Sequence, residues 1–492
     1  MKSIARQSIL TTISSYLGVL IGYFNVLLLL PYALEPEQIG LFRTIQDLAL
    51  LLVPFAQLGL GNGITRFYPQ AKDKQFAFFS LSLFLSMLGF FLVAILFFVF
   101  REYLVSAFAQ NSPEVIDFFG VVLFIALFSV LNSILDSFCR SFLKVAIPTF
   151  FREVLLRLLV SILVLLYFFK WIEFIQLMWG LSIVYFLTLV GMIAYMMKIG
   201  IFKIEFDFKS FPKEFLQDFI KYSLITLLGT TGSLLIMKID SLMVTSMIGL
   251  DANAIYSIAF AIAIVIEIPR RAVSQVVMPV IAENFANNQL GKINVLYKQV
   301  AVHQLLICML LFLGIWSNVN NLYHFVPNNA VYEAGKWVVL WIGLGKIIDI
   351  LFSVNGEIIV YSKYYIFNIT ATLIMSVTVV LLNLALIPLY GIEGAAIASF
   401  LAMGLYNLIK YAYVKIRLSL DPFSWDVAKI IVLGIVVYFV QFFVLKKMDS
   451  GLMDLIIRSV LITVLYLSGA FILKIAEKSQ KELIQKIKGL RP

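Results

Sequence analysis

Long apolar segments recur along the whole chain, and they restrict its fold more than any other feature. Of 492 residues, 62% are hydrophobic and 13% charged, whereas an ordinary soluble domain is about 25% charged. A segment of roughly 20 apolar residues can span a bilayer. Because backbone polar groups in lipid must be satisfied within the protein, and the segments lack the alternating pattern of a barrel, they predict helices. We therefore expect an all-α polytopic membrane protein.

Fourteen segments are predicted to span the membrane, with ends placed to within about three residues. The first is too long for the apolar part of a signal peptide and is interpreted as a retained span. The predicted spans are about 8–30, 41–65, 76–100, 115–138, 146–168, 172–197, 220–247, 253–282, 299–316, 332–353, 364–387, 391–414, 427–444 and 452–474.

The basic residues between these spans favour one side of the membrane. With the N-terminus inside, about 25 of the 38 Lys and Arg residues lie on the cytoplasmic side, and four lie outside, namely Arg101, Lys170, Lys446 and Lys447. This asymmetry predicts a multi-pass membrane protein with both termini in the cytoplasm. It also accounts for the net charge of +10 without a nucleic-acid partner. The external connections, about fourteen residues at most, leave no room for a catalytic domain, so the chain is not expected to be an enzyme.

The sequence repeats weakly on either side of its longest polar connection. Three residue pairs keep nearly one offset: Glu35 with Asp251, Pro54 with Pro269, and Pro69 with Pro279. Pro69 and Pro279 are expected to end two equivalent helices. A parallel repeat of two six-helix lobes follows, with a site expected at the repeat interface. The predicted parts are an N-terminal lobe at 1–198, a cytoplasmic linker at 199–215, a C-terminal lobe at 216–417, helices thirteen and fourteen at 418–474, and a basic cytoplasmic tail at 475–492.

Charged residues lie inside several predicted spans, where each costs at least about 2.5–3.5 kcal/mol at the bilayer centre. Most are three or four residues apart, so that they share a helix face and can partly neutralise one another: Arg43 with Asp47, Asp136 with Arg140, Glu153 with Arg157, Glu267 with Arg270 and Arg271, and Lys346 with Asp349. Lys238 and Asp240 are instead about 200° apart around a helix. At least one of them is expected to find a partner on another helix, in a wet cavity or in a ligand.

These clusters, with the adjacent Arg152, carry an excess of two positive charges, which favours an anionic substrate. Asn25 and Asn62 are candidates for hydrogen bonds to hydroxyl-rich cargo, although Asn also joins helices to each other. A structural alternative stays open for every one of these charges, because each could simply hold two helices together. The sequence contains no GxxxxGK[ST], HExxH or GxSxG motif and no metal-ligand cluster, so no cofactor or metal is expected.

Two segments and a tripeptide carry a resemblance to a known family. They are SYLGVLIGYFNVLLLLPYALEPEQIGLFRTIQDLALLLVPFAQLGLGNGITRFYPQ, NLALIPLYGIEGAAIASFLAMGLYNLIKYAYV and the KID at 238–240. The chain resembles bacterial polysaccharide biosynthesis proteins that flip O-antigen and capsule repeat units (Wzx type), within the multidrug/oligosaccharidyl-lipid/polysaccharide exporter superfamily. The resemblance implies two six-helix lobes around a cavity and two further helices. It also implies cargo of undecaprenyl-pyrophosphate-linked oligosaccharide, moved from the inner to the outer leaflet.

The resemblance also implies roles for the buried charges. The cations expected to meet the pyrophosphate or acidic sugars are Lys238, Arg270, Lys346, Arg43 and Arg157. The carboxylates expected to couple an ion or to position those cations are Asp240, Asp47, Glu267 and Asp349. The expected partners are the lipid-linked glycan, membrane lipids, a coupling proton or sodium ion, and polysaccharide polymerase or export machinery. Related lipid II flippases place several arginines in the first helix, and this sequence has none there, which argues against peptidoglycan precursor as cargo.

Two other functions remain as alternatives. A drug or metabolite antiporter of the same superfamily would show acidic residues without matching cations, because its cargo is usually cationic. A glycan polymerase or ligase would carry a large external loop. The excess of basic residues and the short external connections favour the flippase over both.

Overall fold

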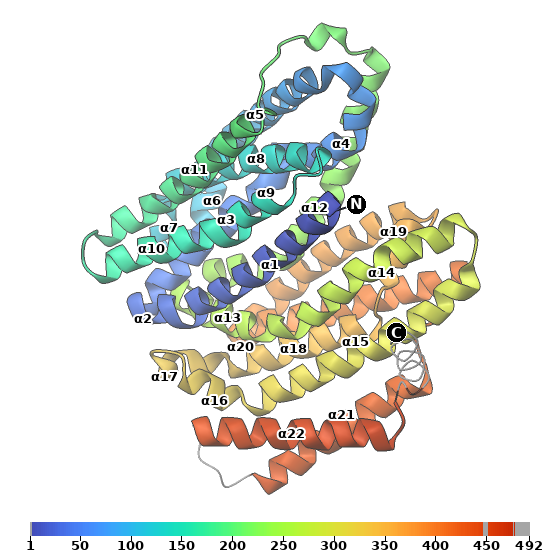
Figure 1. Cartoon of the computed structure of the whole chain (residues 1–492). Coiled ribbons are helices and arrows are strands. Elements are labelled where there is room, and N and C mark those ends of the chain that lie inside the picture. Colours follow the sequence, from blue (N-terminus) through green and yellow to red (C-terminus); the bar gives the residue numbers. More distant parts are fainter. Residues whose placement is uncertain (1, 446–450, 476, 478–492) are drawn as a thin grey trace. The chain divides into compact units, whose positions relative to one another are not determined.

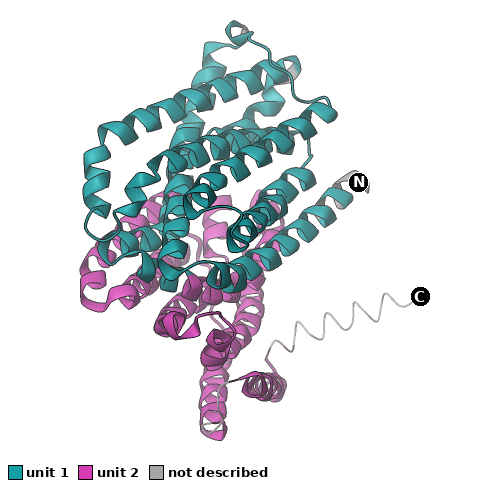
Figure 2. Cartoon of the chain, turned by 90° about the vertical axis from the view of Figure 1, so that its left-hand side faces the viewer, with its two compact units in different colours: residues 1–257 teal, residues 258–492 magenta. Residues whose placement is uncertain are grey.

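A computed structural model describes residues 2–445, 451–475 and 477, and these residues form helices and connections without a strand. Contacts along the chain divide it into two compact units, residues 1–257 (unit 1) and 258–492 (unit 2). Figure 2 colours them teal and magenta. The all-helical fold predicted from the apolar segments is confirmed.

Unit 1 contains twelve α-helices, two π-helices, two 3₁₀ helices and the start of a further α-helix within its described residues. They are α1 (Lys2–Phe24), η1 (Asn25–Leu29), α2 (Leu30–Ala33), α3 (Pro36–Gln57), α4 (Leu60–Phe67), η2 (Tyr68–Lys74), α5 (Gln75–Val99), α6 (Arg101–Phe108), α7 (Glu114–Asp117), α8 (Phe119–Ser141), α9 (Ala146–Phe150), η3 (Phe151–Leu155), α10 (Leu156–Phe168), α11 (Phe174–Lys198), η4 (Phe208–Ser210), α12 (Lys213–Met247) and the start of α13 (Leu250–Ile264).

Helix α8 is the centre of unit 1, since it packs on α3, α4, α5 and α11. Aromatic side chains fill the core beside it. The ring of Phe79 stacks on Phe138 with a centroid distance of 4.4 Å, and Phe78 meets Phe219 of α12 edge to face at 4.9 Å. Such pairs add about 0.5–1.5 kcal/mol each beyond the area they bury. The start of α12 is thereby attached to the N-terminal unit.

A left-handed turn divides the second predicted span, so the single helix expected at 41–65 is wrong. Leu58 and Gly59 have φ of 53° and 68°, and the chain restarts as α4. A Cβ on Gly59 would lie 2.1 Å from the carbonyl oxygen of Ser223 in α12. Only glycine combines this backbone conformation with this close approach. The break brings α4 against α12.

Unit 2 begins inside α13 and continues through η5 (Val265–Glu267), α14 (Ile268–Ala286), α15 (Leu290–Ser317), α16 (Val319–His324), α17 (Asn329–Tyr332), η6 (Glu333–Gly335), α18 (Lys336–Leu351), α19 (Asn355–Tyr361), α20 (Tyr365–Leu418), α21 (Trp425–Val444) and α22 (Leu452–Ile472). Helix α15 packs on α14, α18, α21 and α22, and α18 packs on α20. Pro279 lies inside α14, so the expectation that it closes a helix is wrong.

Two backbone breaks shape unit 2. Gly391, with φ 58° and ψ −137°, divides α20 into two legs. The second break follows α18, where Ser353 has a φ of 53° and α19 leaves at an angle of 48° to the preceding helix. The carbonyl groups freed there find partners, because the hydroxyl of Tyr297 donates to Phe352 O at 3.0 Å and Arg270 donates to Ser353 O at 3.3 Å.

Among the described residues, eleven helices are long and apolar enough to cross a membrane, or twelve if the bent pair α18–α19 is one span. The predicted spans at 364–387 and 391–414 both lie in α20, and the span at 146–168 lies on the continuous segment α9–η3–α10. The count of fourteen stays a prediction. The predicted lobes at 1–198 and 216–417 also stay a prediction, and the tail at 475–492 lies outside the described residues except for 475 and 477.

The close contact of Gly40 in α3 with the start of α13 gives a test of this packing. A Cβ on Gly40 would lie 1.9 Å from Leu250 O. We expect Gly40→Ala to destabilise the protein by about 1–3 kcal/mol, the usual cost of overpacking. The measurement is the melting temperature of the purified protein in detergent.

Gly314→Ala is the matched control, because Gly314 lies in α15 with no atom within 4 Å of its Cβ position. A helical Gly→Ala change in open space is expected to be neutral or to stabilise by about 0.5–1 kcal/mol. Equal melting temperatures for the two variants would contradict the observed packing of α3 on α13.

Candidate functional site

An ion pair between Asp47 of α3 and Lys238 of α12 lies at the centre of the polar residues of unit 1. Lys238 Nζ lies 2.6 Å from Asp47 Oδ1, and Ser241 Oγ donates to Asp47 Oδ2 at 2.9 Å. The side chain of Asp47 is 10% exposed and that of Lys238 is 27% exposed. The carboxylate is therefore buried beneath the ammonium group, with both of its oxygens occupied.

Hydrogen bonds extend this pair into the Asp47–Lys238 network. Asn253 Oδ1 lies 2.8 Å from Ser241 Oγ, and Asn253 Nδ2 donates to Thr44 Oγ1 at 2.9 Å. Thr44 and Thr245 bring their hydroxyl oxygens to 2.8 Å. Thr44, Thr245 and Asn253 have no exposed surface, and buried polar groups satisfied in this way fix one arrangement of the three helices.

Asp240 points to a different partner from Lys238, as their spacing predicts. The hydroxyl of Tyr256 in α13 donates to Asp240 Oδ2 at 2.9 Å. Lys238 reaches α3 and Asp240 reaches α13 from different sides of one turn of α12. The prediction that the two side chains bind separate partners is confirmed.

Arg157 occupies a notch in the first helix of unit 1. A Cβ on Gly22 would lie 2.8 Å from Arg157 Nη1, and Arg157 Nη1 donates to Gly18 O. Arg157 Nη2 also pairs with Glu153 Oε2 at 3.1 Å. Asn25 Nδ2 donates to Arg157 O at 3.0 Å. Gly22 therefore makes room for a guanidinium group that bridges two helices, and Gly18 makes room for the backbone of Glu153.

A chain of ion pairs continues from this notch. Arg152 pairs with Glu153 at 3.2 Å and with Asp136 of α8 at 2.9 Å, and Arg140 lies 3.6 Å from the same Asp136. The side chain of Arg152 is 56% exposed, whereas that of Asp136 is 14% exposed. The guanidinium groups lie outermost, so this surface presents positive charge.

Unit 2 contains a second cluster of charged residues, in which side chains of η5, α14 and α18 form ion pairs with one another. Glu267 binds Lys346 at 2.5 Å and Arg271 at 3.0 Å, and Arg270 binds Asp349 at 3.1 Å. Asn407 of α20 donates to Asp349 Oδ1 at 3.0 Å. In each pair the cation is again more exposed than the carboxylate.

The predicted pairs along single helices are only partly correct. Asp136–Arg140, Glu153–Arg157 and Glu267–Arg271 are confirmed. Among the described residues, Arg43–Asp47, Glu267–Arg270 and Lys346–Asp349 form no ion pair within 4 Å, because Lys238 binds Asp47, Arg270 binds Asp349, and Lys346 binds Glu267. A partner on a neighbouring helix can reach a carboxylate with a shorter and straighter approach than a residue one turn away.

Three of the predicted site residues, Arg43, Asn25 and Asn62, lie outside these ion pairs. Arg43 makes no ion pair with another described residue, and its buried Nε has no hydrogen-bond partner there. Asp47 and Arg157 both act electrostatically on its guanidinium group. Asn25 joins η1 to α10, since Ser161 also donates to its Oδ1 at 2.7 Å, whereas Asn62 is exposed on α4. The binding roles of these residues stay predictions.

Sequence reasoning missed Thr44, Ser241, Asn253 and Lys410. The first three are ordinary polar residues of membrane helices, and no spacing rule connects them across α3, α12 and α13. Lys410 carried a usable signal, because it is a charge inside the apolar segment predicted at 391–414. In the part of the chain that the structure describes, no group of three or more His, Cys, Asp or Glu could hold a metal ion.

Comparisons with known proteins place this geometry among membrane proteins. The sequence model of a family described as "Polysaccharide biosynthesis protein" matches residues 4–285. A comparison with curated protein sequences finds no match. The fold is similar to that of the lipid II flippase MurJ in an inward closed conformation, with a TM-score of 0.75, 18% identity, and coverage of 98% of this chain and 100% of that chain.

The fold is also similar to that of multidrug resistance transporters. A MATE family transporter of the MOP superfamily in an inward-facing conformation gives a TM-score of 0.64 at 16% identity, covering 82% of this chain and 94% of that chain. An outward-facing MATE structure gives a TM-score of 0.57 at 16% identity, covering 85% and 96%. These similarities agree with the all-α membrane fold expected from the sequence.

The Asp47–Lys238 pair gives a direct test of how the network stabilises unit 1. Asp47→Asn leaves Lys238 largely buried without its counter-charge, and we expect a loss of about 3 kcal/mol in the free energy of unfolding. The double variant Asp47→Asn/Lys238→Gln removes both charges and is expected to recover more than half of that loss. The measurement is a double-mutant cycle on thermal unfolding in detergent. Additive effects of the two substitutions would contradict the pairing.

Proposed function

The chain belongs to the polysaccharide biosynthesis protein family, and we propose that it is a flippase for undecaprenyl-pyrophosphate-linked oligosaccharide repeat units. It would move them from the inner to the outer leaflet of a bacterial cytoplasmic membrane by alternating access, with both of its termini in the cytoplasm. The many apolar helices make it a multi-pass membrane protein. The cargo, the direction and the membrane are parts of the proposal.

The observation that carries this proposal is the order of charges in the buried ion pairs. In the pairs of Asp47, Asp136, Glu153, Glu267 and Asp349, the basic side chain is more exposed than the carboxylate. The carboxylates hold the cations in place from beneath, and the accessible cations are Arg140, Arg152 and Arg271, whereas Arg270 and Lys346 are nearly as buried as their partners. A cationic surface of this kind favours an anionic group such as pyrophosphate. A carrier of cationic drugs would need the opposite order.

We assign the pyrophosphate to the cations that these carboxylates position. Each unit has its own candidate set, which is Lys238, Arg157 and Arg43 in unit 1 and Arg270 and Lys346 in unit 2. An arriving phosphate competes with Asp47 for the ammonium group of Lys238, which is 2.6 Å away. Arg43 has no carboxylate within 4 Å among the described residues, so its guanidinium group can donate hydrogen bonds to the phosphate of a ligand. Guanidinium groups bind phosphate through two parallel hydrogen bonds.

The test of this function is leaflet exchange in liposomes that contain the purified protein and a fluorescent undecaprenyl-pyrophosphate oligosaccharide. We expect the wild-type protein to transfer the lipid and Asp47→Asn/Lys238→Gln to transfer it about tenfold more slowly at limiting lipid. The reason is that a charge-assisted hydrogen bond contributes about 1.5–3 kcal/mol. The neutral pair is used so that no unpaired charge remains in the folded variant.

Lys429→Gln is the control, because Lys429 forms an ion pair with Asp426 on α21 outside the proposed site. It should transfer lipid at the wild-type rate. Wild-type protein that moves no lipid-linked glycan but exports cationic dyes would replace the flippase with a drug antiporter. Equal rates for the wild-type protein and both variants would mean that Lys238 has a purely structural role.

Ion coupling forms a separate part of the proposal, and Asp47, Asp240, Glu267 and Asp349 are its candidate carriers. We expect an inward proton or sodium gradient to accelerate transfer, and the Asn or Gln substitution of the coupling carboxylate to abolish that acceleration while transfer without a gradient persists. The measurement is the ratio of transfer rates with and without each gradient. A ratio of one for the wild-type protein would exclude coupling to either ion.

A further inference from the structure

Lys410 of α20 is a buried cation that the proposed function does not use. Its side chain lies in the core of unit 2, with the residue 5% exposed. Within the described chain, its ammonium group has no carboxylate within 4 Å and donates no hydrogen bond. Its contact is with a ring, since Nζ lies 4.3 Å from the centroid of Tyr406. A buried ammonium without an acceptor is costly, which indicates a missing ligand.

Polar groups with unused capacity surround this ammonium. A Cβ on Gly356 would lie 2.6 Å from Lys410 Nζ and 3.8 Å from Asn368 Oδ1, so both atoms lie at the same glycine. Asn368 Oδ1 has no hydrogen-bond donor. Because Gly356 carries no side chain, the ammonium group can lie against this part of α19, where a larger residue would exclude it. The site offers one cationic donor and one neutral acceptor.

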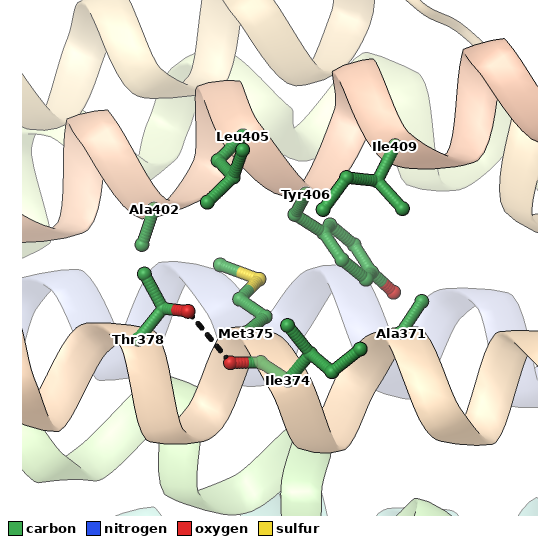
Figure 3. A pocket seen from close by; sticks show the side chains of 8 residues that line it. All are labelled: Ala371, Ile374, Met375, Thr378, Ala402, Leu405, Tyr406 and Ile409. Carbon is green, nitrogen blue, oxygen red and sulfur yellow. Dashed lines mark hydrogen bonds between the residues drawn. The ribbon is translucent and has the colours of Figure 1, made fainter.

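An apolar groove begins at the same tyrosine. The two legs of α20 face each other across it, and Figure 3 shows their side chains pointing into it. The groove is shallow and open on one side, with a cavity volume of about 10 Å³. Besides Thr378 and Tyr406, its lining is apolar: Ala371, Ile374, Met375, Ala402, Leu405 and Ile409. Ile374 and Leu405 are each 45% exposed, so the groove opens on the outer surface of the unit.

The polar and apolar ends of this site are arranged along the two legs of α20. Asn368 and Lys410 lie near the ends of α20 at Tyr365 and Leu418, and Thr378 and Ala402 lie nearer the turn at Gly391. Lys410 is eight residues from Leu418, which is about 12 Å along the helix axis. The cation thus lies toward one membrane surface, and the groove extends from it toward the bilayer centre. A membrane lipid has the same polarity.

From this arrangement we propose that unit 2 binds one anionic phospholipid of the bilayer, with its phosphate on Lys410 and an acyl chain in the groove. A single ammonium matches the single negative charge of a phosphodiester. A headgroup hydroxyl, as in phosphatidylglycerol, supplies the donor that Asn368 Oδ1 lacks. Basic pockets between membrane helices bind anionic headgroups in this way. This lipid is a resident partner of the fold, distinct from the proposed cargo.

The experiment is native mass spectrometry of delipidated full-length protein titrated with phosphatidylglycerol or phosphatidylcholine. We expect the wild-type protein to bind one phosphatidylglycerol in preference to phosphatidylcholine. Lys410→Met should weaken that binding about tenfold, the effect of losing a charge-assisted hydrogen bond, and leave phosphatidylcholine unchanged. Lys415→Gln is the control, because Lys415 lies on the same leg of α20 and is paired with Asp421. It should bind as the wild-type protein does.

Thermal unfolding distinguishes loss of the lipid from loss of the fold. Lys410→Met removes an unpaired buried charge, so its melting temperature without lipid should equal or exceed that of the wild-type protein. Adding phosphatidylglycerol should raise the melting temperature of Lys410→Met less than it raises that of the wild-type protein. Ile374→Trp keeps the ammonium but fills the open side of the groove, and it should also weaken binding of phosphatidylglycerol.

Two results would overturn the proposal. One is equal affinity of Lys410→Met and the wild-type protein for phosphatidylglycerol. The other is displacement of phosphatidylglycerol by equimolar undecaprenyl-pyrophosphate oligosaccharide in the wild-type protein, with loss of that cargo's binding in Lys410→Met. The second result would make the groove part of the cargo path. Neither result depends on whether the protein flips lipid-linked glycan in liposomes.

Discussion

A charged side chain inside a membrane-spanning helix is stable only when a counter-charge or a hydrogen-bond partner lies within reach. Asp47 meets this condition for Lys238 in unit 1, and Asp349 meets it for Arg270 in unit 2. Each of these pairs joins helices far apart in the sequence. The compensation of buried charge therefore also determines which helices are neighbours, and most of the polar structure of each unit follows from it.

The same compensation leaves a positive surface. The carboxylates of Asp136 and Glu153 are the less exposed partners, and the guanidinium groups of Arg152 and Arg157 lie over them. The acids thus position the cations without hiding them. This order of burial connects the stability of unit 1 to the anionic cargo that we propose, because an anionic ligand can bind the outer cation of each pair and compete with the carboxylate beneath it.

Breaks in the helices place several of these residues. The turn at Gly59 brings α4 against α12 at a distance that no larger residue allows. After α18, the carbonyl groups of Phe352 and Ser353 leave the helical pattern and bind Tyr297 and Arg270. Arg270 therefore satisfies both a freed carbonyl and a carboxylate. The backbone break and the charged group of unit 2 depend on one guanidinium.

The sequence by itself determined the class of fold, because the length and apolar character of a membrane helix are local properties. It also determined the pairs Glu153–Arg157 and Glu267–Arg271, since residues four apart share a helix face whatever surrounds them. From the spacing alone it showed that Lys238 and Asp240 need separate partners. Only the tertiary structure decided that those partners are Asp47 and Tyr256, and that Lys346 binds Glu267 rather than Asp349. The reason is that competition for a carboxylate depends on the distance between helices, which no spacing along one helix contains.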